Sequence, residues 1–164
     1  MKAVLGLLLL TMIACATVTP PQEAPPGRTR APSTRYVNPS QEINDRYAQR
    51  VAAWVGNRNK EPADQVFKNL QIEWLKSVPA ENLIDIMNYG YSRALGVSCT
   101  HCHVEADFAS DEKRPKRAAR EMAVMHRGVN AQLRQMKNLE SPAGDRNINC
   151  FTCHRGAINP NKPQ

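Results

Sequence analysis

The chain has 164 residues and a formal net charge of +7, and 41% of its residues are hydrophobic but only 5% are aromatic. This length fits one small domain better than two. Because bulky apolar side chains are scarce and the mean hydropathy is −0.53, we expect something other than side chains to fill part of the interior. The apolar stretch at residues 4–10 is too short to cross a bilayer as a helix, which argues against an integral membrane protein.

Residues 1–15 have the pattern of a secretory signal, with a basic residue, an apolar run and a small residue before Cys15. Met12 to Cys15 resemble the end of a bacterial lipoprotein signal, in which the cysteine becomes the lipid-modified first residue; that family prefers Leu where this chain has Met12. We therefore predict a signal peptide at residues 1–14 and a lipid on Cys15, which would hold the protein on the periplasmic side of a bacterial membrane. The alternative is an ordinary signal peptide that contains a cysteine.

Residues 15–40 are predicted to form a lipid-anchored tether. Six of the twelve prolines lie between residues 16 and 40, and this stretch has no apolar periodicity. Proline favours extended, polyproline-like segments, so the tether would hold a folded domain at residues 41–164 clear of the membrane surface.

Two early helices are predicted, at residues 40–56 and 63–76. Ser40 is a suitable N-terminal cap for the first helix, and Gly56 is a suitable stop. Each helix carries one tryptophan that we expect to pack against neighbouring elements: Trp54 and Trp74.

A third helix is predicted from Pro79 to Ala94. Proline suits the first turn, Glu81 complements the positive end of the helix dipole, and Gly96 follows just after the end. The apolar residues of this helix include Met87, which lies twelve positions before the first of two cysteine pairs.

Four cysteines beyond Cys15 form two pairs of identical spacing, and a histidine follows each pair directly. The two strings are Cys99-Thr100-His101-Cys102-His103 and Cys150-Phe151-Thr152-Cys153-His154. C-x-x-C-H is the attachment signature of c-type haem. Two thiols at this separation can each add to one vinyl group of the porphyrin, and the adjoining histidine then lies beneath the iron. We predict two covalently bound haem c groups, one held by Cys99, Cys102 and His103 and the other by Cys150, Cys153 and His154.

Two other uses of four cysteines agree less well with this pattern. A four-cysteine zinc site is disfavoured because 47 residues separate the pairs, and zinc needs no histidine after each pair. Disulfides are common in exported proteins, but they do not account for the two histidines either. His101 lies inside its own motif and is expected to be exposed to solvent.

Each iron has a sixth coordination position that needs a donor from elsewhere in the chain. A helix that ends at Gly96 and turns back into the first motif would lay Met87 over the haem face opposite His103. Before the second motif, a helix predicted from Pro115 to Lys137 has an apolar stripe that offers four candidate donors: Met122, Met125, His126 and Met136. Spacing alone favours Met136. It lies fourteen residues before Cys150, and this is similar to the spacing of Met87, which lies twelve residues before Cys99.

A cluster of basic residues precedes and enters this helix: Lys113, Arg114, Lys116, Arg117 and Arg120. We expect a solvated face or partners for haem propionates, and the alternative is a surface that steers an acidic redox partner. Nucleic acid is not expected as a partner of an exported cytochrome. Residues 157–164 contain two prolines and are expected to be irregular.

Residues 64–156 resemble the cytochrome subunit of bacterial photosynthetic reaction centres and its non-photosynthetic relatives. Six segments carry the resemblance: Val66-Phe67-Lys68-Asn69-Leu70, the helix that contains Met87, Leu95-Gly96-Val97-Ser98-Cys99, Cys102-His103-Val104, the Ala119–Met125 segment, and Cys150-Phe151-Thr152-Cys153-His154-Arg155-Gly156. In that family a helix with the axial methionine precedes most attachment motifs, which supports Met87. In that family, the axial ligand of the next haem occupies a position that resembles that of Met122, which lies nineteen residues after His103. On this ground we choose Met122 over Met136 as the ligand of the second haem. The family's subunit carries four haems in two pairs, whereas this chain carries one pair of motifs.

Together these patterns predict an all-α fold, a small multihaem c-type cytochrome with helices wrapped around two haems. The predicted function is one-electron transfer, with redox proteins or a membrane electron-transfer complex as partners and with no catalytic residues. The alternative is a haem enzyme or gas sensor with one five-coordinate haem, such as a peroxidase, for which only His126 offers acid–base chemistry near a motif.

Overall fold

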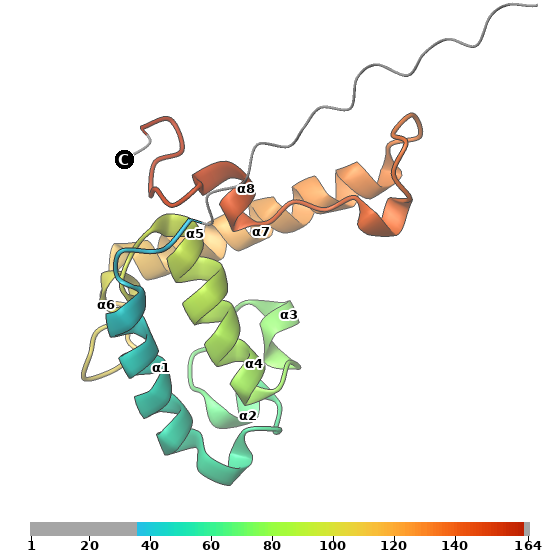
Figure 1. The fold of residues 1–164 in the computed structure, drawn as a ribbon. Coiled ribbons are helices and arrows are strands. Elements are labelled where there is room, and N and C mark those ends of the chain that lie inside the picture. Colours follow the sequence, from blue (N-terminus) through green and yellow to red (C-terminus); the bar gives the residue numbers. More distant parts are fainter. Residues whose placement is uncertain (1–35, 163–164) are drawn as a thin grey trace, which may run out of the picture. The chain divides into compact units, whose positions relative to one another are not determined.

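Helices supply nearly all the regular structure of residues 36–162, which are the part of the chain that the computed structural model describes (Figure 1). This part contains no β-strand, so the predicted all-α fold is confirmed. In chain order the helices are α1 (Gln41–Val55), η1 (Gly56–Arg58), α2 (Ala63–Val66), α3 (Glu73–Lys76), α4 (Ala80–Asp85), η2 (Ile86–Ser92), α5 (Arg93–Leu95), α6 (Cys99–Cys102), α7 (Arg114–Gln135), η3 (Ala143–Asp145) and α8 (Cys150–His154). Of these, η2 is a π-helix, and η1 and η3 are 3₁₀-helices.

The predicted helix at residues 40–56 is confirmed as α1, which lies alongside α4 and η2 (Figure 1). Gly56 ends it with a φ of 59°, a backbone conformation that glycine adopts without strain. Ser40 precedes the first residue as predicted, but its hydroxyl does not cap the helix. The Asn38 side chain instead accepts a hydrogen bond from the Ser40 backbone N–H at 2.9 Å.

The prediction of one helix at residues 63–76 is wrong, because α2 and α3 are separate four-residue helices. Phe67 has an extended backbone, and Asn69 has a φ of 59°. The Asn69 amide donates to the Ala109 carbonyl at 2.6 Å and to the Asp111 carboxylate at 2.9 Å. These contacts with a distant loop favour the break, and Asn tolerates the left-handed conformation better than most residues.

The helix predicted from Pro79 to Ala94 is confirmed as the continuous run of α4, η2 and α5. The π-helical segment η2 was not predicted, and it contains Met87. It also contains Asn88, a buried residue whose amide donates to the Asp45 carboxylate at 2.8 Å. Insertions of this kind are frequent at functional sites because they re-aim the side chains of one turn.

The hydrophobic core consists of two small clusters. One is built around Val55, Val66 and Ala80, and the other around Ala63, Leu75 and Leu83. The prediction that both tryptophans pack is not met for Trp54, which is 66% exposed although its ring lies 6.0 Å from that of Phe67. Clusters this small agree with an interior that side chains alone do not fill.

The backbone just before the first motif, at Gly96, packs closely against the backbone just after the second motif, at Gly156. We call this contact the crossing of Gly96 and Gly156. Gly96 follows the end of α5, as predicted, and its backbone is in the left-handed conformation with a φ of 69°. The Gly156 N–H donates to the Ala94 carbonyl at 2.9 Å, and the Tyr36 hydroxyl donates to the Gly156 carbonyl at 3.2 Å. The crossing therefore holds α5 against α8, next to both cysteine pairs.

The predicted helix at residues 115–137 is confirmed as α7, and residues 157–162 are irregular as predicted. The predicted signal peptide and most of the predicted tether lie outside the described residues. Residues 36–40, assigned to the tether, pack on the domain, where Asn38 is 2% exposed and donates to the Ser92 and Val97 carbonyls at 3.1 and 3.0 Å. The folded part thus begins before residue 41. Within residues 36–162, none of the helices combines the length and the apolar character needed to span a bilayer.

Candidate functional site

Each cysteine pair lies on a short helix of its own, α6 or α8. All four thiols are free, and burial raises the pKa of Cys99, Cys102 and Cys150. In the described part of the chain, no group of three or more His, Cys, Asp or Glu side chains is placed to hold a metal ion. The geometry of these residues therefore gives no support to a shared zinc site or to disulfides, and it leaves four thiols available for thioether bonds.

The two motif histidines are oriented in the same way. His103 Nδ1 lies 2.8 Å from the Phe108 carbonyl oxygen, and His154 Nδ1 lies 3.0 Å from the Ala157 carbonyl oxygen. A nitrogen that donates to a carbonyl must carry the proton, so Nε2 is left as the lone-pair nitrogen in both rings. Burial lowers the pKa of His103, which favours the neutral form that binds a metal. This donor set fits c-type haem at both strings.

The first motif is anchored by a buried amide on α1. Asn44 is fully buried, and its side chain accepts from the Cys99 N–H at 2.8 Å and donates to the Val97 carbonyl at 3.0 Å. The α6 helix has no side-chain cap of its own. Asn44 thus caps the motif helix from a different part of the chain and fixes the backbone on both sides of Ser98.

The second motif has an equivalent anchor on α7. Asn130 is 6% exposed, accepts from the Ile148 N–H at 2.7 Å and donates to the Ile148 carbonyl at 3.1 Å. In addition, Asn149 and Thr152 form a capping box at the start of α8. In both motifs, a buried asparagine on a longer helix holds the residue two positions before the first cysteine.

Replacing Asn44 with alanine should lower the free energy of unfolding by about 2 kcal/mol, because the Cys99 N–H loses a buried hydrogen-bond partner. Denaturant unfolding of the purified protein measures this. The matched control is Asn82→Ala on α4, where the side chain is exposed and the change should stay within about 0.5 kcal/mol. Equal effects of the two substitutions would contradict the anchoring role of Asn44.

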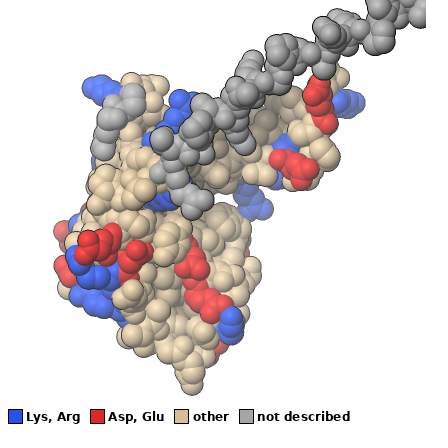
Figure 2. Space-filling model, viewed as in Figure 1, with Lys and Arg blue, Asp and Glu red and all other residues tan. Residues whose placement is uncertain are grey.

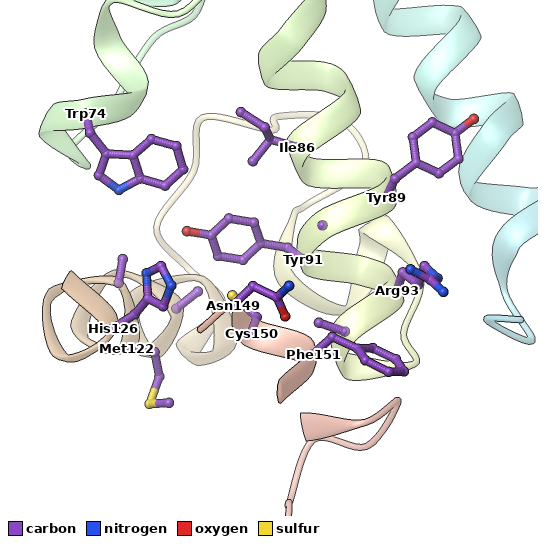
Figure 3. Close-up of a pocket in the computed structure, with 14 residues that line it drawn as sticks. Trp74, Ile86, Tyr89, Tyr91, Arg93, Met122, His126, Asn149, Cys150 and Phe151 are labelled. Atoms are coloured by element: carbon purple, nitrogen blue, oxygen red, sulfur yellow. The ribbon is translucent and has the colours of Figure 1, made fainter. Parts of the chain in front are cut away.

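A cavity of about 240 Å³ opens beside the second motif (Figure 3). It is mostly apolar and is lined by Trp74, Ile86, Tyr89, Gly90, Tyr91, Arg93, Ala94, Ala119, Met122, Ala123, His126, Asn149, Cys150 and Phe151. Burial raises the pKa of Tyr91 to about 12, so its phenol stays neutral. The structure therefore brings Cys150, Met122 and His126 to one cavity, whereas Met125 and Met136, about half exposed, do not line it.

Two candidate iron donors line the cavity, His126 and Met122, and they differ in their polar contacts. His126 Nε2 lies 2.7 Å from the Ile148 carbonyl oxygen, and the Asn130 amide lies 2.8 Å from the same nitrogen. Met122 makes no comparable polar contact, is 40% exposed, and extends from α7 away from Tyr91 in the view of Figure 3. The α7 stripe is buried less deeply than its apolar pattern indicates, since its fully buried positions are Ala123 and Asn130.

Met87 lies on η2, the segment that contacts both motif helices α6 and α8. Its side chain is partly buried and packs against the cluster around Leu75 and Leu83. The structure thus brings the Met87 segment to the first motif.

The predicted basic cluster does not form a free basic patch. Lys113 donates to the Thr100 carbonyl inside the first motif, and Lys116 donates to three carbonyls of the loop at residues 108–110. Arg120 pairs with Asp111 at 2.8 Å, and this contact holds the pKa of Asp111 well below its usual range. Figure 2 shows acidic and basic side chains interleaved near α1 and α6. Four of the five cations, all except Arg114, bind the first motif or the loop at residues 103–113 that follows it, so the cluster is engaged with the protein more than the expected solvated face implies.

His101 is only partly exposed, and burial lowers the pKa of its imidazole. The sequence does not indicate the anchoring asparagines, Phe108, or the cavity residues Trp74 and Tyr91 as site residues, and it indicates Lys116 only as a partner for haem propionates. One signal was available for Asn44, since it falls on the same helical stripe as Tyr47, Val51 and Val55. A polar residue in an apolar stripe indicates a buried hydrogen-bonding role.

An all-helical domain with two such thiol–imidazole strings defines a c-type cytochrome. The family model of the photosynthetic reaction centre cytochrome C subunit matches residues 22–163, and the chain belongs to this family. Membership implies electron transfer and covalently bound haem c.

Two curated relatives agree with this assignment. The chain is similar to cytochrome c-554 of Chloroflexus aurantiacus, with 37% identity over 90 residues that make up 55% of this chain and 21% of that protein. It is also similar to the photosynthetic reaction center cytochrome c subunit of Rubrivivax gelatinosus, with 38% identity over 90 residues, 49% of this chain and 24% of that protein. The chain thus spans less than a quarter of either relative's length.

Proposed function

We propose that this protein is an exported di-haem c-type cytochrome that carries single electrons between membrane-associated redox partners. The observation that carries the proposal is the common build of the two strings. In each, the thiols are free and the histidine Nδ1 faces a backbone carbonyl, which leaves Nε2 for a metal. Haem c, when bound, supplies a one-electron iron couple.

Eight residues would hold the two groups: Cys99, Cys102, His103 and Met87 at the first, and Cys150, Cys153, His154 and Met122 at the second. The cysteines would fix the groups covalently, and the histidines would bind through Nε2. A methionine thioether raises the potential relative to a second histidine. Met122 is preferred to His126 because the His126 Nε2 is already engaged by the Ile148 carbonyl. The apolar wall that includes Trp74 and Tyr91 would limit the access of water to a group bound at the second site.

The location at a membrane is part of the same proposal. A signal peptide at residues 1–14 would export the chain, and a lipid on Cys15 would anchor it through the tether. The family supports association with a membrane electron-transfer complex, since one relative is named as a reaction-center subunit. If the protein is such a subunit, it will co-purify with a complex from detergent-solubilised membranes, whereas a free carrier will elute alone.

Intact-mass spectrometry of the mature protein tests the haem number, and a spectroscopic redox titration tests the function. We expect the mass of two added haems and two reversible one-electron steps. Fewer than two haems would contradict the proposal. Rapid binding of carbon monoxide by one haem of the reduced protein would instead favour the enzyme or gas-sensor alternative, because it requires an open sixth position.

A further inference from the structure

Lys116 is the most fully engaged cation near either motif. Its side chain is only 11% exposed, and its Nζ donates to the carbonyl oxygens of Phe108, Ala109 and Ser110 at 2.9, 2.7 and 2.9 Å. Burying an ammonium group is costly unless it is well paired. Three carbonyls converging on one ammonium therefore indicate a built site and not a surface side chain that happens to lie nearby.

The Phe108 carbonyl joins this ammonium to the proposed iron ligand. The same oxygen accepts from His103 Nδ1 at 2.8 Å, and the Phe108 ring stacks on the His103 ring with 4.9 Å between centroids. Lys116 thus reaches His103 through one shared oxygen atom. It also holds the loop that keeps this oxygen and the stacked ring in place.

At the second motif, the guanidinium of Arg93 lies 5.1 Å from the centre of the Phe151 ring, and it donates to the Tyr36 carbonyl and not to the carbonyl that faces His154. His154 Nδ1 meets the Ala157 carbonyl, and among the described residues no lysine or arginine donates to that oxygen. Around the first motif, Lys113 and Arg120 add positive charge, and Asp111 lies 3.4 Å from Lys116 as the partly neutralising carboxylate. The two histidines therefore have similar geometry but different electrostatic surroundings.

Two physical effects of this ammonium act in the same direction. A carbonyl that accepts from Nδ1 makes the imidazole a stronger donor to iron, and a cation on the same oxygen weakens that effect. A buried positive charge also favours the reduced state of a nearby iron, which has one positive charge fewer than the oxidised state. Water and salt screen this charge little because the side chain is buried.

We propose that Lys116 is a positioning residue that holds the Phe108 carbonyl on His103 and, through its charge, raises the redox potential of the haem at the first motif. The inference rests on the proposed di-haem function and deepens it. According to this inference, the two attachment motifs hold their histidines in a similar way but differ in electrostatics, because only the first has the buried ammonium of Lys116 beside its histidine.

The test is a redox titration of the full-length haem-loaded Lys116→Met variant. We expect the reduction equilibrium constant of one haem to fall about fivefold, or roughly 40 mV given 59 mV per tenfold change for one electron. Lys116→Arg keeps the charge and should restore most of the loss. Lys137→Met, at the far end beyond α7, removes the same charge about 30 Å along the helix and should change neither potential.

The Asp111→Asn variant separates an effect of the Lys116 charge from a merely structural role of Lys116 in the loop. Removing this carboxylate leaves Lys116 less neutralised and should raise the potential of the same haem, whereas a loosened loop would lower it by admitting water. Unchanged potentials in Lys116→Met, or equal shifts at both haems, would overturn the inference. Intact-mass spectrometry separates failure of the proposed function from failure of the inference about Lys116. A missing haem in the unmodified protein contradicts the proposed di-haem function and does not bear on the role of Lys116.

Discussion

Replacing Gly96 with alanine should destabilise the folded protein by roughly 3 kcal/mol or more, which is the range of severe backbone and packing defects. An added Cβ would lie 2.0 Å from the Gly156 carbonyl oxygen and 2.7 Å from the Tyr36 hydroxyl. The first of these neighbours is backbone and cannot move aside cheaply. A φ of 69° adds strain for any residue with a side chain.

Gly128→Ala is the matched control, because Gly128 lies within α7 and a Cβ there would meet nothing within 4 Å. This substitution should stabilise the protein by about 0.5–1 kcal/mol, the usual gain for alanine over glycine inside a helix. Thermal and denaturant unfolding of the haem-loaded protein measure both variants. A Gly96→Ala protein as stable as the unmodified one would mean that the crossing of Gly96 and Gly156 is not tightly packed.

The same crossing explains why one domain can carry two attachment motifs at a fixed separation. Gly96 lies three residues before Cys99, and Gly156 lies two residues after His154. The hydrogen bond from Gly156 to Ala94 therefore ties the start of one motif to the end of the other. If the proposed pair of haems is present, a link of this kind would hold the two groups at a constant distance, which favours electron transfer between them.

The longer helices could be predicted because their signals are local. Gly56 and Gly96 mark helix ends that any isolated segment would also favour, and the apolar period of residues 115–137 extends over the whole of α7. The π-helical turn around Met87 could not be predicted in this way. Its extra residue per turn is stabilised by tertiary contacts, such as that of Asn88 with Asp45.

Of the candidate site, the sequence shows only the two attachment strings. The C-x-x-C-H strings are complete in the sequence, but the residues that orient them come from distant segments, 55 positions away for Asn44 and Cys99. The basic cluster illustrates the same limit. Its charge is visible in the sequence, but its role depends on a loop whose carbonyls turn toward Lys116.

Removing either proposed axial thioether should produce the largest redox change. Met87→Ala and Met122→Ala should each abolish the methionine-to-iron charge-transfer absorption of one haem and leave that of the other. The affected potential should fall by on the order of 0.1 V, a modest part of the roughly 0.8 V that axial ligands control. Optical spectra and redox titrations of the two variants measure these changes.

Met125→Ala is the control for the second haem, since Met125 lies on the same helix as Met122, is 50% exposed and does not line the cavity. It should leave both absorption bands and both potentials in place. If Met122→Ala also leaves the bands intact while His126→Ala alters one haem, the axial ligand is His126. The imidazole would then have to give up its Ile148 contact or bind through Nδ1, because its Nε2 already faces that carbonyl at 2.7 Å. The thioether of Met122 has no such competing partner, so it is the donor that can bind without breaking a hydrogen bond.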